Sequence, residues 1–222
     1  MTLLITACGP SAAAGTPPTP TVVAPPTTAP QISTPVQSSA APATPVPTST
    51  ASASTSNTAS ALACTAPAQL TPALTEGPYF KAGSPERASL IDSTVTGTKL
   101  VLTGYVVTTD CKPVANAKID FWQADAQGNY DNQGYRLRGH VFSDASGRYQ
   151  VTTIVPGLYP GRTEHIHVKV QTPGGNVLTS QLFFPDVASN QRDNIYNARL
   201  LVNVQKADDG YNATYNFVVR PQ

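Results

Sequence analysis

The chain has 222 residues, a length typical of one or two domains, and a formal net charge of +1. None of its 14 basic and 13 acidic residues precedes Glu76, so the first third of the chain carries no charged side chain. This balance gives no electrostatic reason to expect nucleic acid as a partner, and no stretch approaches the roughly 18 apolar residues of a membrane-spanning helix.

The first residues are similar to the end of a bacterial lipoprotein signal. Ile5-Thr6-Ala7-Cys8 matches a lipobox, in which the cysteine is lipidated after cleavage. The apolar run before Cys8 is only about six residues long and no basic residue precedes it, so an ordinary apolar start is the alternative. We interpret residues 1–8 as a residual signal and expect an extracytoplasmic protein, either a cell-envelope lipoprotein tethered through Cys8 or a secreted one.

Residues 9–63 consist almost wholly of Ala, Pro, Ser, Thr and Val, and they contain 11 of the 21 prolines. They include no aromatic residue and show no hydrophobic period. Such a segment cannot bury enough apolar surface to offset its ordering entropy. We therefore predict a disordered linker over 9–63 and a folded domain over 64–222, where aromatic and charged residues appear.

Two cysteines remain after Cys8, and both fall in the predicted domain. Two thiols of an exported domain usually pair. The expected export therefore favours a disulfide between Cys64 and Cys111. Two buried free thiols are the alternative.

The domain is rich in strand patterns. Many short strands with turn-like stretches between them indicate an all-β fold, a β-sandwich of mainly antiparallel strands with little helix. Residues 188–198 could form one helical turn or two. The predicted strands are 99–107, 117–124, 148–154, 165–170, 180–184, 200–204 and 213–219. The turn-like stretches are 125–128, 144–147, 172–175 and 208–210.

The pair His165 and His167 is the sharpest chemical signal. On a strand, residues i and i+2 point to the same face, so the two imidazoles converge while Ile166 packs into the core behind them. This is the geometry of metal ligands, although a pair of surface histidines also fits the pattern. Taken alone, the pair leaves zinc, copper and iron open as the metal.

Other residues decide between these possibilities. The run from Pro156 to Arg162 is rich in Pro and Gly, which fixes a tight path and brings Tyr159 and Arg162 near the histidine strand. A further tyrosine, Tyr130, follows the strand predicted at 117–124.

These segments resemble the intradiol ring-cleavage dioxygenases, the family of catechol 1,2-dioxygenase and protocatechuate 3,4-dioxygenase. LTGYVVTTDCKPVANAKIDFWQADAQGNY, which ends at Tyr130, is similar to the first signature of the family, and PGLYPGRTEHIHVKV, which carries His165, is similar to the second. TEGPYF from Thr75 resembles the entry segment of the family, and FFPD from Phe183 also matches. The resemblance covers Cys64 to about Val219.

The resemblance implies an enzyme that opens a catechol-type diol with dioxygen and gives a cis,cis-muconate-type diacid. It implies one non-haem Fe(III), with four ligands carried over by position: Tyr130, Tyr159, His165 and His167. The residue types agree, because phenolate oxygen is a hard anionic donor that suits Fe(III), and imidazole is a good partner.

The resemblance also assigns roles to three catalytic residues. Arg162 would stabilise negative charge that develops on the substrate ring. Gln181 would orient the substrate. One tyrosine would leave the metal and take a substrate proton, and Tyr159 is the better candidate because it lies on the loop flanked by proline and glycine, whereas Tyr130 ends a strand-turn. Four neighbouring residues are expected to be structural: Tyr79 in the pocket wall, His140 in a strand, Asp125 in a turn and Trp122 in the core.

The sequence departs from the cytoplasmic members of the family in three respects. Cys111 replaces a small Gly or Ser, as in extracellular relatives, which supports the disulfide. The interval between Tyr159 and Arg162 is much shorter, and the linker replaces the helical N-terminal region through which those enzymes dimerise. The last two differences imply a more open site and a monomer. The charge of Glu164, beside His165, has no predicted effect.

Two alternative functions remain from other classes. One is a non-catalytic binding module, because transthyretin-like and carboxypeptidase-regulatory sandwiches contain similar segments. The segments in this chain are Val114–Lys118 and Ser143–Tyr149. Such modules give no reason for His-x-His preceded by Tyr and Arg. A protein that binds iron or copper without turnover is the other alternative. Catechol, hydroxyquinol, protocatechuate and lignin-derived catechols all stay open as substrates.

Overall fold

Residues 64–220 are described by the computed structural model of the protein. The predicted lipobox at 1–8, the linker at 9–63 and the lipidation of Cys8 all concern residues outside this part, and they stay predictions. Among the described residues, no helix is long and apolar enough to cross a membrane.

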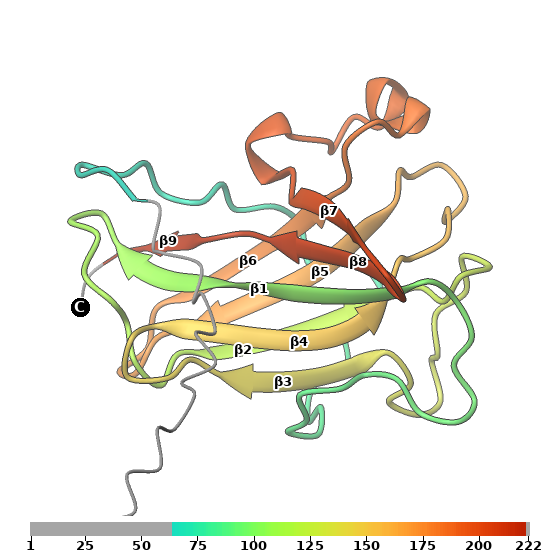
Figure 1. Cartoon of the computed structure of the whole chain (residues 1–222), viewed down its shortest axis with the longest axis horizontal. Coiled ribbons are helices and arrows are strands. Elements are labelled where there is room, and N and C mark those ends of the chain that lie inside the picture. Colours follow the sequence, from blue (N-terminus) through green and yellow to red (C-terminus); the bar gives the residue numbers. More distant parts are fainter. Residues whose placement is uncertain (1–63, 221–222) are drawn as a thin grey trace, which may run out of the picture. The chain divides into compact units, whose positions relative to one another are not determined.

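Two β-sheets face each other in this part of the chain (Figure 1). One has the strand order β4-β1-β8-β7, with β9 also paired to β1, and the other has the order β3-β2-β5-β6. Every pairing between these strands is antiparallel except those of β1 with β8 and with β9. The predicted β-sandwich is therefore confirmed. The strands are β1 (Lys99–Thr108), β2 (Lys118–Gln123), β3 (Arg138–Phe142), β4 (Arg148–Ile154), β5 (His165–Gln171), β6 (Val177–Phe183), β7 (Asn203–Ala207), β8 (Gly210–Thr214) and β9 (Phe217–Val219).

Helical structure within 64–220 is confined to two short 3-10 helices, η1 (Ala188–Arg192) and η2 (Ala198–Leu200). Both lie between β6 and β7, in the region where the sequence predicts one or two turns. The prediction of little helix is therefore confirmed for the described residues.

The core lies between the two sheets, because side chains alternate along each strand. In β1, Leu100 and Leu102 are buried, whereas Val101 and Thr103 are partly exposed. Full burial of a side chain such as Leu or Ile stabilises the fold by about 1.5–3 kcal/mol. The facing sheet contributes Ile119, Phe121, Ile166, Val168, Val170 and Leu182 to the same core.

The same alternation puts polar and aromatic side chains on the outer face of the second sheet. Trp122 of β2 pairs with His167 of β5, and His167 pairs with Gln181 of β6. One residue further along, Phe121 and Val168 point into the core instead. The register of three neighbouring strands therefore lines up an indole, an imidazole and an amide on one face.

The predicted strand 213–219 is interrupted and becomes β8 and β9. At the interruption, the side-chain oxygen of Asn216 accepts a hydrogen bond of 3.0 Å from the N–H of Tyr105, in place of a backbone carbonyl. The offset to β1 is the same on both sides of the interruption. Gly104 allows this approach, because a Cβ there would come within 1.7 Å of the carbonyl oxygen of Tyr215.

The strand predicted at 200–204 is wrong in position, since β7 begins at Asn203. The side chain of Asn197 accepts a backbone N–H and starts η2, and this 3-10 turn buries Leu200. The apolar run therefore reaches the core largely from a turn. The strand predicted at 180–184 begins earlier, at Val177, because its hairpin with β5 extends back to the turn at 172–175.

A disulfide joins Cys64 to Cys111, with the two Cα atoms 5.8 Å apart, as the sequence analysis favours. The bond ties the start of the described segment to the turn that follows β1. The linked residues are 47 positions apart, so the bond closes a long loop in the unfolded chain.

Replacing both cysteines, Cys64→Ser with Cys111→Ser, should lower the free energy of unfolding by about 4 kcal/mol, because the open loop regains conformational entropy. Urea unfolding of the two proteins measures this difference, and reduction of the native protein should reproduce the effect of the double variant. A loss under about 1 kcal/mol would contradict the expected role of the bond.

Candidate functional site

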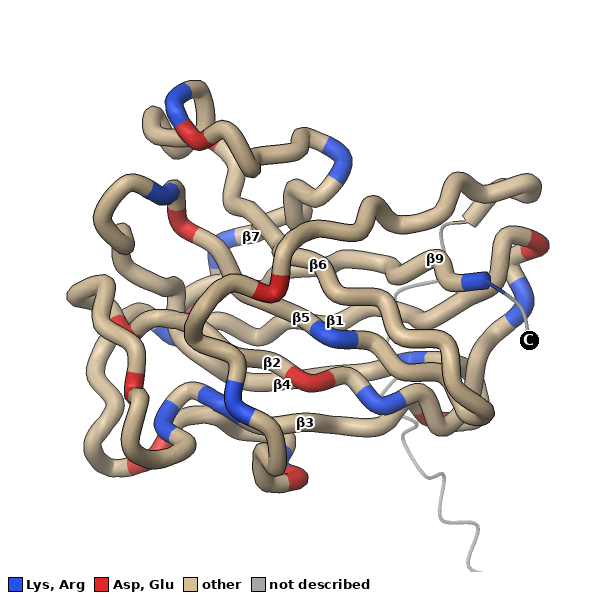
Figure 2. The backbone as a smooth tube through the Cα atoms, turned by 180° about the vertical axis from the view of Figure 1, so that it is seen from behind, with Lys and Arg blue, Asp and Glu red and all other residues tan. Residues whose placement is uncertain are grey.

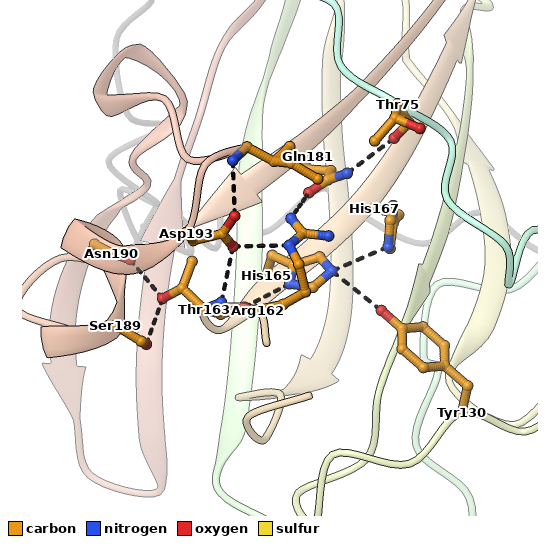
Figure 3. A network of polar contacts seen from close by, with 11 residues as sticks. Thr75, Tyr130, Arg162, Thr163, His165, His167, Gln181, Ser189, Asn190 and Asp193 are labelled. Atoms are coloured by element: carbon orange, nitrogen blue, oxygen red, sulfur yellow. Dashed lines mark hydrogen bonds and ion pairs between the residues drawn. The ribbon is translucent and has the colours of Figure 1, made fainter. Parts of the chain in front are cut away.

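Two imidazole rings and one phenol meet on the outer face of the second sheet. The Nε2 atoms of His165 and His167 lie 3.1 Å apart, and the Oη of Tyr130 lies 3.3 Å from Nε2 of His165 (Figure 3). Both histidines are buried. The expectation that positions i and i+2 of this strand converge is therefore confirmed, and the two are not surface histidines.

The tautomer of His165 is fixed by its other ring nitrogen. Its Nδ1 lies 2.6 Å from the carbonyl oxygen of Thr163, and a carbonyl only accepts, so Nδ1 carries the proton and donates it. The lone pair of Nε2 then points toward His167 and Tyr130. Burial lowers the pKa of His165 to about 4, so the ring is neutral near physiological pH.

His167 packs tightly among neighbours that leave one of its nitrogens unsatisfied. Its ring stacks on the indole of Trp122, with centroids 4.9 Å apart and an interplanar angle of 8°. Gly77 also lies against it, since a Cβ there would come 3.1 Å from Cε1. Burial lowers the pKa of His167 well below its usual value. Among the buried side-chain nitrogens and oxygens in residues 64–220, Nδ1 of His167 and Nε1 of Trp122 lack a hydrogen-bond partner.

Tyr130 is held by a turn that Asp125 organises. The carboxylate of Asp125 accepts the N–H of Asn129 at 2.9 Å, and the N–H of Asp125 donates to the carbonyl of Asn129 at 2.8 Å. Gly128 has a φ of +83°, and a Cβ there would come within 2.0 Å of the carbonyl oxygen of Leu158. Only glycine therefore lets this turn pack against the segment that carries Tyr159. Asp125 is the turn residue that the sequence predicts.

Tyr159 and Arg162 stand at the two ends of one β-turn. The N–H of Arg162 donates to the carbonyl of Tyr159 at 2.9 Å, and Pro160 and Gly161 occupy the central positions. Gly161 has a φ of +80°, the conformation that a type II turn requires at its third residue. The Pro-Gly pair thus fixes the spacing of the phenol and the guanidinium just before β5.

Tyr79 lies between the two tyrosines that the sequence predicts as ligands. Its ring stacks on Tyr130 with centroids 4.3 Å apart, and its Oη lies 2.9 Å from the Oη of Tyr159. Tyr159 meets Tyr130 edge-on, with ring centroids 5.9 Å apart. The structure therefore brings Tyr130, His165 and His167 into direct contact and places Tyr159 beside them, bonded to Tyr79. The sequence predicts Tyr79 in the pocket wall but not these two contacts.

The entry segment is fastened over the outer face of the sheet. Nε2 of Gln181 donates to the carbonyl of Thr75 at 2.9 Å. The ammonium of Lys169 pairs with the carboxylate of Glu76 and lies 3.5 Å from the ring centroid of Phe80. Lys169 belongs to β5, so these contacts hold the segment against the histidine strand and explain how the run TEGPYF contributes to the site.

Arg162 is held from two sides (Figure 3). Its Nη2 donates to Oε1 of Gln181 at 2.6 Å, and its Nε donates to Oδ2 of Asp193 at 2.9 Å. The same Asp193 oxygen accepts the N–H of Thr163 at 2.9 Å. The Asp193 side chain is 1% exposed and that of Arg162 is 14% exposed, so the ion pair is largely shielded from water. The guanidinium group of Arg162 is therefore held in one orientation near the histidines.

Asp193 is a functional candidate that the sequence analysis misses. Asp193 directly follows η1, in a polar loop that shows no hydrophobic period. Nothing in the sequence indicates which residue of this loop faces the histidine strand. Burial alone would raise the pKa of Asp193, but hydrogen bonds from Thr163, Ile195 and Arg162 lower it overall, so the carboxylate is charged at neutral pH.

The variant Asp193→Asn should lower kcat per bound iron between about 10- and 100-fold, because Arg162 loses the partner that fixes its direction. Steady-state turnover normalised to iron content measures this effect, and Asp193→Glu should restore part of it. If kcat per iron stayed at the native value while only thermal stability fell, the role of Asp193 would be structural.

Two residues near the site in sequence lie elsewhere in the fold. Glu164 does not join the cluster; it lines a separate pocket with Phe184 and Tyr211, where burial raises its pKa. His140 lies in β3, as predicted, and its Nδ1 is 3.0 Å from the hydroxyl of Ser84. Trp122 is buried, as expected of a core residue, but it stacks on His167.

Residues 75–221, about two thirds of the chain, match a protein-family model described as dioxygenase. This chain belongs to the intradiol ring-cleavage dioxygenase family. The family match leaves the hypothesis of a non-catalytic sandwich module without support.

Similar proteins include curated dioxygenases and solved dioxygenase structures. Catechol 1,2-dioxygenase 2 of Acinetobacter lwoffii is 32% identical over 171 residues, which cover 62% of this chain and 62% of that protein. Hydroxyquinol 1,2-dioxygenase of Rhizobium sp. is 29% identical over 165 residues, covering 62% of this chain and 56% of that protein. The chain thus spans less than two thirds of either relative.

One similar solved structure is the dioxygenase domain of a dioxygenase carbohydrate-binding protein fusion from Streptomyces sp. SirexAA-E. It is 49% identical to this chain, with a TM-score of 0.67, and the match covers 68% of this chain and 99% of that domain. An intradiol ring-cleavage dioxygenase from Tetranychus urticae is 25% identical with a TM-score of 0.64. Both share the sandwich described above.

Members of this dioxygenase family use non-haem iron. In residues 64–220, no group of three or more His, Cys, Asp or Glu side chains gathers to hold a metal, so a site built on the two histidines needs a further donor of another kind. The cluster of His165, His167 and Tyr130 meets this need. Donors about 3 Å apart are spaced as neighbouring ligands with metal bonds of about 2.1 Å would be. The unprotonated Nε2 of His165 is already directed at the other two donors, so the residues present fit an iron ion.

Proposed function

We propose that this chain is an intradiol dioxygenase that cleaves a catechol-type diol between its two hydroxylated carbons. The observation that carries the proposal is the contact of Tyr130, His165 and His167, with the fixed charge of Arg162 beside them. Tyr130, Tyr159, His165 and His167 would hold one Fe(III). The ion would supply Lewis acidity that draws electron density from the bound diol.

The phenol of Tyr130 needs a cation to act as a ligand. Burial raises its pKa above the usual value near 10, because the charged form is poorly solvated there. Arg162 and Arg138 oppose this effect only in part. A trivalent ion against the oxygen would reverse the balance and hold the phenolate at neutral pH. The neutral imidazole of His165, with its proton kept on Nδ1 by Thr163, offers its lone pair without a proton to displace.

Tyr159 is the residue best placed to move a proton. Its turn is flanked by proline and glycine, and its Oη is hydrogen-bonded to the Oη of Tyr79. We propose that the Tyr159 oxygen accepts a proton from a substrate hydroxyl, while Tyr79 holds the released phenol aside through the same hydrogen bond. Tyr130 keeps its place because its turn is closed by Asp125.

Arg162 provides the charge that ring opening requires. Its guanidinium is preorganised by Asp193 and Gln181, so negative charge that develops on the ring would be stabilised without reorganisation. Both polar atoms of the Gln181 amide are engaged, with Arg162 and with Thr75, so this residue orients the substrate by holding Arg162.

Oxygen uptake tests the proposal. Iron-loaded protein should consume dioxygen when catechol or a substituted catechol is added, and the metal-stripped protein should not. The same panel of catechols identifies the preferred ring. No uptake on any catechol, with iron fully bound, would favour a metal-binding protein without turnover.

We also propose that the enzyme works outside the cytoplasm, tethered by Cys8 or secreted. The support is the Cys64–Cys111 disulfide, since such bonds persist mainly in oxidising compartments. Cell fractionation should find the chain outside the cytoplasm; a cytoplasmic protein with both thiols reduced would contradict this.

A further inference from the structure

A cavity of about 350 Å³ adjoins the site on the side of Tyr159 and Arg162. These two residues line it together with the turn between them and with the end of η1. The site histidines and Tyr130 do not line it. The cavity therefore shares Tyr159 and Arg162 with the site but is separate from the cluster of His165, His167 and Tyr130. Its lining residues are Leu158, Tyr159, Pro160, Gly161, Arg162, Ser189, Arg192 and Asp193.

The charges around this cavity do not cancel. Asp193 is its acidic residue, and that carboxylate is already paired with the guanidinium of Arg162 at 2.9 Å. Arg192, at the end of η1, is exposed, and its side chain has no ion pair or hydrogen bond in the described part of the chain. One uncompensated positive charge therefore remains in the wall of the cavity.

Leu158 adds an apolar surface to the same cavity. This residue is 55% exposed and is one of the few large apolar residues left in contact with water in residues 64–220. A leucine and a free arginine in the wall of one cavity suit a ligand with an apolar arm that ends in a negative charge. The leucine would cover the arm, and the arginine would pair with the anionic end.

The rest of the surface would not produce such a preference. Basic and acidic positions are interspersed over the described backbone (Figure 2). The formal net charge of the chain is only +1. Long-range attraction of anions is therefore weak, and any selection for them has to come from a local group.

We propose that this cavity is a subsite for a ring substituent and that Arg192 selects catechols carrying a short apolar arm with an anionic end. The inference rests on the proposed function, because it takes the diol to be bound at the cluster of Tyr130, His165 and His167. A substituent on that ring would pass Tyr159 and Arg162 to enter the cavity. Arg192 would then determine specificity without touching the reacting carbons.

Equilibrium binding without oxygen tests this inference independently of turnover. Calorimetry on the iron-loaded protein would give Kd for 3-(3,4-dihydroxyphenyl)propanoate and for its neutral amide, which share the ring and the arm. The ratio of the two Kd values should favour the acid, and Arg192→Gln should reduce that preference about five-fold, the effect of an exposed ion pair. Arg192→Lys should keep most of it, and added salt should weaken it in the native protein.

Arg220→Gln is the matched control, because Arg220 is an exposed arginine that lines a different groove beyond β9. In the Arg220→Gln protein, the ratio of the Kd values for the amide and the acid should stay within about two-fold of the native ratio. An unchanged ratio in Arg192→Gln, or an equal fall in Arg220→Gln, would overturn the subsite. If neither compound bound, the inference would also fail. A normal Arg192-dependent ratio without any oxygen uptake would instead refute the proposed function alone.

Discussion

Replacing Arg162 by Gln should lower kcat by about 10²–10³ while the protein keeps its iron. The guanidinium is oriented by Asp193 and Gln181 before any substrate arrives, so it stabilises developing charge that a neutral amide would not. In residues 64–220, no hydrogen bond joins the Arg162 side chain to His165, His167 or Tyr130, so iron content should change little. Turnover and iron content of the same preparation measure the two effects separately.

Stability has to be controlled in this experiment, because the substitution leaves the carboxylate of Asp193 buried and unpaired. Breaking such a pair from one side commonly costs about 3–5 kcal/mol. The double variant Arg162→Gln with Asp193→Asn removes both charges and should regain stability but not turnover. If the double variant regained turnover along with stability, the catalytic role of Arg162 would be refuted.

Replacing Tyr130 by Phe should weaken iron binding by more than about 100-fold. A tyrosinate bound to Fe(III) would colour the protein through charge transfer, and most of this colour should be lost with the iron. The phenol oxygen lies 3.3 Å from Nε2 of His165, in direct contact with a histidine of the cluster. The ring would stay packed against Tyr79 after the substitution. Iron content and visible absorption of the purified protein measure the loss.

Tyr79→Phe is the matched control for this experiment. Tyr79 stacks on the same ring, but its hydroxyl contacts Tyr159 and not the histidines. The variant should therefore keep its iron and most of its colour. The ligand assignment would be wrong if Tyr79→Phe lost the colour and Tyr130→Phe kept it.

The histidine strand and its turn could be predicted from the sequence because their patterns are local. The alternation His-Ile-His fixes which side chains share a face, and the order Tyr-Pro-Gly-Arg fixes a type II turn. The disulfide could also be predicted, because two cysteines remain after Cys8 and the expected export favours their pairing. In these cases the information lies within a few residues or in a simple count.

The parts that could not be predicted depend on contacts between distant segments. Asp193 reaches Arg162 from a loop that follows β6, and no period or motif marks which loop residue turns inward. At the break between β8 and β9, the Asn216 side chain, and not a backbone carbonyl, accepts the N–H of Tyr105 in β1. A continuous apolar pattern hides such a substitution. The place of Leu200 in a buried turn is hidden in the same way.

The fate of isotopically labelled dioxygen tests the central claim most directly. Iron-loaded protein supplied with catechol and labelled dioxygen should give a ring-opened cis,cis-muconate-type diacid that contains both labelled atoms. The cut should fall between the two hydroxylated carbons. A yellow semialdehyde, produced by cleavage beside the diol, would contradict the account, as would a diacid that carries no label.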